Sequence, residues 1–154
     1  MPETIPSLRP EIPLVPPRSE FIYEALIDLL PNMDLGDGPL GHRRMVPIIG
    51  GVFEGPRLRG KVLPGGADRQ LLRKDGVLKL DALYELQTDD GAVITVHNTV
   101  TIHTPPDGPR YAFSTIDITA PTGPHDWLNR YAYVGTLHSQ APRPQVLIRV
   151  YRLI

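Results

Sequence analysis

Polar side chains fall among apolar ones in several segments of this sequence that alternate like β-strands. The clearest case is Asn98 in "AVITVHNTVTIH", where it lies in the middle of a face formed by Ile94, Val96, Val100 and Ile102. Burying an unpaired polar group costs roughly 1–3 kcal/mol, so an inward amide needs a reason. Asn98 could bind a carbonyl group or orient a water molecule, or it could satisfy the backbone at a bulge.

A carboxylate and an arginine are the next candidates. Asp68 ends the turn-like string "PGGAD" and can either cap local backbone amides or face a cavity as a general base. The second role requires burial to raise its pKa against the pull of a nearby arginine. Alternation does not decide whether Arg43 or Arg44 points inward. An inward guanidinium would bind a carboxylate or polarise a carbonyl; the alternative is a salt bridge to an acid such as Glu54 or Asp68.

Tyrosines and one tryptophan could complete such a site. Tyr84 lies on the apolar face of "VLKLDALYELQ", so its ring is expected inside, where a phenol is a competent acid. Tyr131 and Tyr133 share a strand face, and Trp127 follows a loop and is expected to cover or plug one end of the fold. Tyrosines and one tryptophan around a small cavity describe a site for a small, partly apolar, oxygenated molecule, and they describe a well-packed core nearly as well.

Several other kinds of site are excluded or disfavoured. The chain has no cysteine, so disulfides and thiolate chemistry are excluded. His97 and His103 share a strand face but lie about 20 Å apart, too far for one ion, and no metal site is expected. Ser114 lacks the sharp turn that a nucleophilic serine needs, and "GGADRQ" lacks the helix and lysine of a phosphate-binding loop. No cofactor is expected.

Charge and hydropathy indicate the compartment and partners. The net charge is −1, from 16 basic and 17 acidic residues, so no overall field points to nucleic acid or an anionic membrane. No apolar run approaches a membrane span, and "MPETIPSLRP" lacks the apolar core of a signal peptide. A soluble, cytoplasmic protein with a small-molecule partner is expected, and the sequence leaves a homodimer open.

The elements that must position these residues are short strands. The 18 prolines and 14 glycines disfavour long helices and favour strands joined by turns. Residues 1–19 read as a proline-rich arm and residues 20–154 as one β-domain. Strands are expected over 21–30, 42–55, 57–65, 69–76, 77–87, 92–103, 110–119, 129–137 and 145–154, with 31–41 a loop and "TDDG" a hairpin turn. This pattern predicts an all-β fold: a closed antiparallel up-and-down barrel of about eight or more strands, with a two-sheet sandwich second.

The strings "RRMVPIIGGVFEGPRLRGKVLPGGAD", "DGVLKLDALYELQTDDGAVI", "WLNRYAYVGT" and "VLIRVYRL" resemble, in the same order, the uncharacterised-protein family 0311 (domain of unknown function 3237). The resemblance spans roughly residues 40–154 and implies a small antiparallel β-barrel. It favours Arg43 as the inward arginine and implies cofactor-free addition or cyclisation chemistry on small unsaturated carbonyl compounds in some relatives. The sequence departs from the family pattern at Arg69, along 97–100 and in a short segment between His103 and Tyr111.

Together these observations predict a cofactor-independent enzyme that acts on an unsaturated carbonyl compound by conjugate addition, cyclisation such as an intramolecular oxa-Michael addition, or isomerisation. Arg43, Asp68 and Tyr84 are the expected catalytic residues, converging with Asn98 on one cavity that has Trp127 at its rim. The alternatives are a carrier or sensor that binds a similar molecule unchanged, and an assembly module whose barrel is filled solid.

Overall fold

The structure is a computed structural model that describes residues 6–154, and it contains ten strands and one short 3₁₀-helix in that range. The elements are β1 (Ser19–Leu29), β2 (Met33–Gly38), β3 (Gly41–Glu54), β4 (Arg59–Val62), β5 (Gly66–Arg73), β6 (Leu78–Thr88), β7 (Val93–His103), β8 (Tyr111–Thr119), η1 (Asp126–Arg130), β9 (Tyr133–Ser139) and β10 (Gln145–Leu153).

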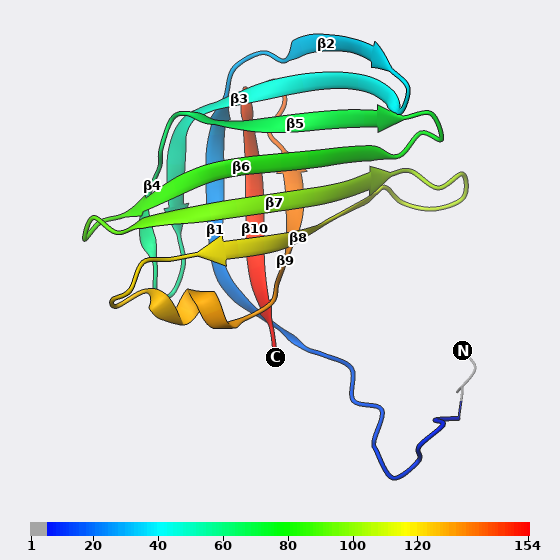
Figure 1. Ribbon diagram of the computed structural model, residues 1–154, viewed down its shortest axis with the longest axis vertical. Helices are drawn as coiled ribbons and strands as arrows, with labels where there is room; N and C mark the ends of the chain where they lie inside the picture. Colours follow the sequence, from blue (N-terminus) through cyan, green and yellow to red (C-terminus); the bar gives the residue numbers. More distant parts are fainter. Residues whose placement is uncertain (1–5) are drawn as a thin grey trace.

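The strands close into an antiparallel barrel with eight positions. From β6 to β10 each strand pairs with the next along the chain, β10 pairs with β1, and β1 pairs with β3. β4 and β5 follow one another in a single position between β3 and β6, and β2 extends the sheet beside β3. Figure 1 shows β5, β6 and β7 crossing in front of β1, β9 and β10. The predicted closed all-β barrel is therefore confirmed.

The first strand shows why alternation outweighs helix propensity here. Tyr23, Ala25 and Ile27 are buried at period two, as expected for a strand that lines a barrel. A bulge between Phe21 and Tyr23 shifts the register with β10, so that Ile22 is also buried and Phe21 is partly exposed.

The segment 31–41 was predicted as a loop, and this prediction is wrong for part of it. Met33–Gly38 forms β2, which pairs with the first half of β3. β1 pairs only with the second half of β3, from Ile48 to Glu54, so the first half would otherwise present a free edge. The turn-rich composition of β2 concealed this edge-covering role, whereas the hairpin turn predicted at Thr88–Gly91 joins β6 to β7 as expected.

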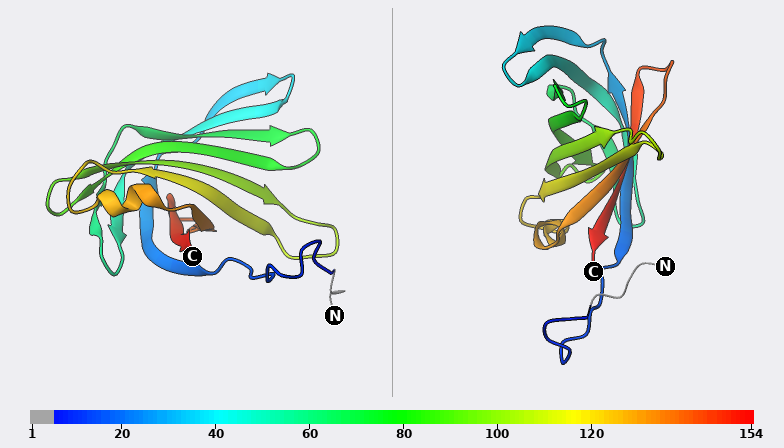
Figure 2. Two further views of the ribbon diagram at one scale, coloured as in Figure 1. Left: turned by 60° about the horizontal axis from the view of Figure 1, so that its bottom comes forward. Right: turned by 90° about the vertical axis from the view of Figure 1, so that its right-hand side faces the viewer.

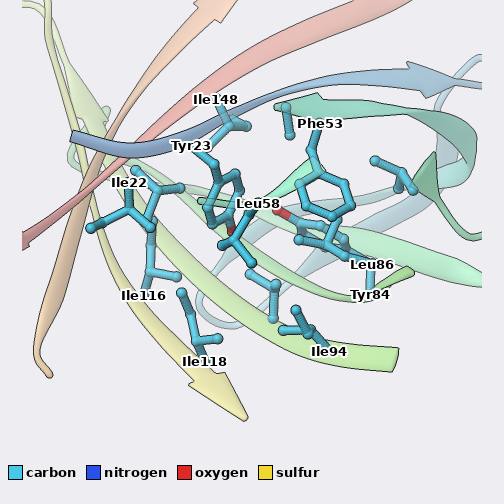
Figure 3. Packing of buried hydrophobic residues seen from close by; sticks show 14 of the residues in the cluster. Ile22, Tyr23, Phe53, Leu58, Tyr84, Leu86, Ile94, Ile116, Ile118 and Ile148 are labelled. Carbon is cyan, nitrogen blue, oxygen red and sulfur yellow. The ribbon is translucent and has the colours of Figure 1, made fainter. Parts of the chain in front are cut away.

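One end of the barrel is filled by side chains. Figure 3 shows Tyr23, Phe53 and Tyr84 packed among aliphatic residues, with the rings of Tyr23 and Phe53 5.8 Å apart in an edge-on arrangement. Leu128 of η1 is 1% exposed, and the Tyr133 hydroxyl donates a 2.8 Å hydrogen bond to its carbonyl oxygen. The helix therefore closes this end and leaves the other end as the place for a cavity.

A glycine in β3 and another at the start of β5 allow neighbouring strands to approach closely. Gly51 has φ of +135°, and a Cβ there would lie 2.2 Å from the carbonyl oxygen of Leu26, so no other residue fits this point of β3. At Gly66 a Cβ would lie 2.5 Å from the Cβ of Tyr84 on β6. Glycine here lets β5 pass over Tyr84 and keeps that side chain in the interior.

Gly66→Ala should therefore destabilise the protein. We expect the free energy of unfolding to fall by about 1–3 kcal/mol, the usual cost of overpacking, because either Tyr84 moves or β5 separates from β6. Urea denaturation measures the change. Gly38→Ala is the matched control: its added Cβ meets nothing closer than 3.8 Å, so its effect should be about 0.5 kcal/mol or less. Equal stability of the two variants would contradict the role given to Gly66.

The predicted arm, residues 1–19, lies partly outside the described residues, which begin at residue 6. From there to residue 18 the chain contains no strand, and it leaves the barrel near the C-terminus (Figure 2). Arg18 and Ile154 exchange two backbone hydrogen bonds of 2.9 Å, and Ser19, predicted as the last arm residue, already belongs to β1. Within residues 6–154, no helix has the length and apolar character needed to span a bilayer.

Candidate active site

A cavity of about 290 Å³ lies inside the barrel, toward the end opposite η1. Most of its wall is aliphatic, and its mouth lies where β6, β8 and β10 begin and where β1, β7 and β9 end. The lining residues are Ile27, Leu29, Arg44, Val46, Ile48, Asp68, Gln70, Leu78, Leu80, Ala82, Tyr84, Asn98, Val100, Ile102, Arg110, Leu137, Ser139, Gln145, Val146 and Ile148.

Three side chains form a hydrogen-bonded chain on one wall. The Gln70 amide nitrogen donates to Asp68 Oδ2 at 2.8 Å, and Arg44 Nε donates to Gln70 Oε1 at 2.5 Å. The strand pattern produces this arrangement. Asp68 and Gln70 lie two residues apart and so share one face of β5, and Arg44 is the cross-strand partner of Gln70 on β3. One oxygen of Asp68 is thereby fixed in place.

The second oxygen of Asp68 is shielded from solvent and has no hydrogen-bond partner in the described part of the chain. Burial raises the pKa of the Asp68 carboxyl above its usual value, and the negative charge of Asp81 adds to this effect, while the hydrogen bond from Gln70, the backbone of Asp81 and the charge of Arg44 act in the opposite direction. Asp68 thus combines a held orientation, a free acceptor atom and increased basicity. These properties suit a general base.

Asn98 faces Asp68 across a small residue. Asp68 pairs with Ala82, and Ala82 pairs with Asn98, so the three lie in one row across β5, β6 and β7. Two strand spacings separate the outer two backbones by about 10 Å, and the methyl group of Ala82 leaves the space between them open. Asn98 is 2% exposed, and its Oδ1 has no partner among residues 6–154. The inward position predicted for Asn98 is confirmed.

Tyr84 follows Ala82 by two residues on β6, on the same face, and contributes a neutral hydroxyl to the cavity. Its side chain is 1% exposed, and its hydroxyl finds no hydrogen-bond partner within the described chain. Burial raises the pKa of the Tyr84 phenol well above its usual value, and the negative charge of Asp68 raises it further. The phenol therefore keeps its proton and can donate it in a hydrogen bond to an acceptor in the cavity.

The mouth carries groups that the sequence reasoning did not select, namely Arg110, Ser139 and Gln145. Gln145 is held by a 2.7 Å hydrogen bond from its amide nitrogen to Asp28 Oδ1. Arg110 precedes the first residue of β8 and has the same parity as the buried Ser114 and Ile116. That parity is the one signal that could have identified it.

The structure corrects the choice between the two arginines. The resemblance favoured Arg43, but Arg43 is exposed, and its guanidinium donates a 3.0 Å hydrogen bond to the carbonyl oxygen of Leu35 on β2. Arg44 lines the cavity instead, because it shares a face of β3 with Val46 and Ile48. β2, which was not expected, provides the contact that holds Arg43 outside.

The three aromatic residues predicted to bind substrate lie elsewhere in the barrel. Trp127 belongs to η1 at the closed end, where the Arg57 guanidinium lies 4.0 Å from its ring. Tyr131 is 43% exposed, with the Arg152 guanidinium 4.5 Å from its ring, and Tyr133 is part of the packed core. None of the three lines the cavity, so Trp127 plugs the opposite end and does not form the rim.

The histidines are placed on the outer face of the barrel or in loops. His97 Nε2 lies 2.7 Å from Asp81 Oδ1, and the His103 ring packs on Tyr111 at 5.3 Å. In the part of the chain that the structure describes, no three His, Cys, Asp or Glu side chains are grouped so that they could hold a metal ion.

Comparison with known proteins identifies the family. A family model described as "Protein of unknown function (DUF3237)" matches residues 17–153. The chain belongs to the DUF3237 family. A UPF0311 protein from Rhodopseudomonas palustris is 33% identical over 132 residues, which is 77% of this chain and 85% of the relative.

The crystal structure of a β-barrel-like protein from Acinetobacter baumannii superposes with a TM-score of 0.81 at 30% identity and covers 91% of this chain and 98% of its own. A more distant relative has a named activity: the hydroalkoxylation enzyme phnH from Penicillium herquei is 28% identical over 121 residues, 79% of this chain and 74% of that protein. The crystal structure of an enzyme from Penicillium herquei, at 22% identity, has a TM-score of 0.75 over 93% of this chain and 98% of its own, and so has the same fold.

Proposed function

We propose that this protein is a cofactor-independent enzyme that adds a hydroxyl group across a carbon–carbon double bond conjugated to a carbonyl, as in the cyclisation of a hydroxy-enone. The observation that carries the proposal is Asp68. It is a carboxylate in an apolar cavity, with one oxygen held by Gln70 and the other free. Burying a carboxylate in an apolar cavity is costly, so a carboxylate in such a place is a candidate for a functional role.

The reaction follows from the three polar groups that face the cavity. Asp68 accepts the proton of the substrate hydroxyl, and the oxygen forms a bond to the β-carbon as the double bond shifts to give an enolate. The Tyr84 hydroxyl donates a hydrogen bond to the enolate oxygen, where negative charge develops. The proton on Asp68 then passes to the α-carbon. The O–H and C=C bonds are exchanged for C–O and C–H bonds, so neither an oxidant nor a leaving group is required.

Asn98 and the apolar wall position the substrate. Asn98 Oδ1 is an acceptor, so it suits a second hydroxyl or an N–H group on the substrate, and the aliphatic lining suits its carbon framework. Holding the hydroxyl and the alkene in contact favours the ring closure by reducing the entropy to be lost.

The distant relative supports this choice among the reactions that the site could catalyse. Hydroalkoxylation is the addition of an alcohol O–H across a carbon–carbon multiple bond, which is the step derived above, and phnH carries that name. A cavity that holds both a carboxylate and a phenol favours this enzyme over a carrier, for which a purely apolar pocket would suffice. A cavity of about 290 Å³ also argues against a barrel filled solid.

The test is a panel of hydroxy-enones incubated with the protein. Loss of the enone absorbance measures the rate, and chiral chromatography measures the enantiomeric excess of the cyclic product. An enzyme accelerates cyclisation of at least one member and gives an excess of one enantiomer, since the uncatalysed reaction gives a racemate. Saturable binding of the panel without acceleration would instead support a carrier.

The rate should depend on pH in one direction only. Asp68 acts in its ionised form, so kcat/KM should rise with pH through the pKa of Asp68, which burial places above the ordinary value of about 3.9. Tyr84 acts in its protonated form, and its raised pKa keeps it protonated throughout the measured range. We expect a rising limb followed by a plateau that extends beyond pH 9. A rate that falls as pH rises through this limb would contradict Asp68 as the base.

A further inference from the structure

The lining of the cavity carries an excess of positive charge. Its charged side chains are two guanidiniums, Arg44 and Arg110, and one carboxylate, Asp68. Arg44 is linked to Asp68 through Gln70, so these two charges offset one another. Arg110 takes part in none of the ion pairs formed within residues 6–154. Arg110 is exposed, so it acts at the mouth of the cavity, where a cation without a counter-charge is suited to an anionic group of a ligand.

Arg110 lies at the mouth of the cavity, between a proline-rich segment and the start of β8. It ends the segment "TPPDGPR", in which three prolines restrict the backbone, and it precedes Tyr111, the first residue of β8. The pairing of β8 with β9 ends at Phe113 and Thr136, so Arg110 and Ser139 both lie beyond the paired part of these strands, at the end where the cavity opens. Both residues line the cavity and are exposed, so a guanidinium and a hydroxyl group are both available at its entrance.

We propose that the substrate carries a carboxylate, remote from the reacting atoms, which Arg110 and Ser139 bind at the mouth of the cavity. A planar guanidinium matches a carboxylate with two parallel hydrogen bonds, and the serine hydroxyl can donate a third. The hydroxy-enone end of the same molecule then lies deeper, between Asp68 and Tyr84. Binding of the remote carboxylate orients the reacting end, which is how enzymes use contacts far from the chemistry.

The volume limits the substrate that fits this arrangement. A cavity of about 290 Å³ holds roughly ten water molecules at about 30 Å³ each, so the enclosed part of the substrate is small. A single aromatic or unsaturated ring with a short acidic side chain meets this limit. The proposal specifies the substrate class of the proposed reaction and rests on it, but it is tested by binding alone.

The experiment compares a carboxylate with its neutral counterpart. Calorimetry or ligand-observed NMR would measure the Kd of para-hydroxycinnamate and of para-hydroxycinnamamide, which differ only in the charged group, for the full chain. We expect the carboxylate to bind roughly tenfold more tightly or better, the effect of one charge-assisted contact of about 1.4 kcal/mol. Arg110→Met should remove this preference and leave the Kd of the amide unchanged, whereas Arg110→Lys should keep part of it.

Arg43→Met is the matched control, because Arg43 lies on the same end of the barrel but outside the cavity, and it should leave the preference intact. Asp68→Asn should keep this preference or increase it, because it removes a negative charge from the cavity. This separates the proposal from the proposed reaction: a protein that catalyses no addition can still show the preference. Equal affinity for acid and amide, a preference that survives in Arg110→Met, or no binding of para-hydroxycinnamate at millimolar concentration would each overturn the proposal.

Discussion

Replacing Asp68 by asparagine is expected to lower turnover of an accepted hydroxy-enone by about 10²–10⁴-fold, the usual contribution of a general acid–base group. Asparagine has nearly the same shape, and its side-chain oxygen can still accept the hydrogen bond from Gln70. What is lost is the ability to take a proton. The KM should change far less than kcat, and the rising limb of the pH profile should disappear with the base.

The same substitution should not weaken the fold. A carboxyl whose pKa is raised on folding binds more protons in the native state than in the unfolded state at pH values between its two pKa values. Stability therefore falls as pH rises through that window, and the cost is fully present above it. Asp68→Asn removes this cost, so at pH 7 the variant should melt at the same temperature as the native protein or higher. The difference should shrink as the pH falls toward about 4.

Asp117→Asn is the control for both measurements, because Asp117 is exposed on the outer face of β8. It should change neither turnover nor the melting temperature. Native turnover in Asp68→Asn would show that the base is another group. A loss of turnover accompanied by a large fall in melting temperature would show that Asp68 is structural.

Alternation along strands was the informative signal for this site. Asn98 and Tyr84 were placed inside the barrel from their apolar neighbours at period two, and both line the cavity. Burial of an uncharged polar side chain on such a face is costly, so its position in the pattern is meaningful. The same reasoning identified the barrel itself, since short alternating strands without a helix pattern must close or leave edges exposed.

The predictions from the sequence were wrong for residues whose position depends on which strands pair with one another. Parity could not choose between Arg43 and Arg44, because each shares its parity with apolar residues of β3. The structure places Arg44 on the cavity face with Val46 and Ile48, and Arg43 outside against Leu35 on β2. Trp127 was correctly placed at a barrel end, but the sequence did not say which end holds the cavity. Gln70 was overlooked because an amide on a half-polar strand carries little cost until its partners on β3 and β5 are known.

The second large effect is expected at Tyr84. Tyr84→Phe should lower kcat by about 10²–10³-fold, the range found when one oxyanion donor is removed, since the phenol is the neutral donor deepest in the cavity. The change removes a hydroxyl that has no hydrogen-bond partner in residues 6–154, so no internal bond is lost and stability should be equal or slightly higher. Measuring kcat on the accepted hydroxy-enone alongside thermal unfolding tests both statements.

Tyr23 provides a matched control for this substitution. Tyr23 and Tyr84 are both 1% exposed, and the Tyr23 hydroxyl also lacks a hydrogen-bond partner in the described structure. Tyr23 differs in that it does not line the cavity. Tyr23→Phe should therefore leave kcat unchanged. If both variants lose activity, the tyrosines act by packing, and if neither does, the enolate oxygen is held by another donor. A loss confined to Tyr84→Phe would tie the effect to the one phenol that faces the substrate.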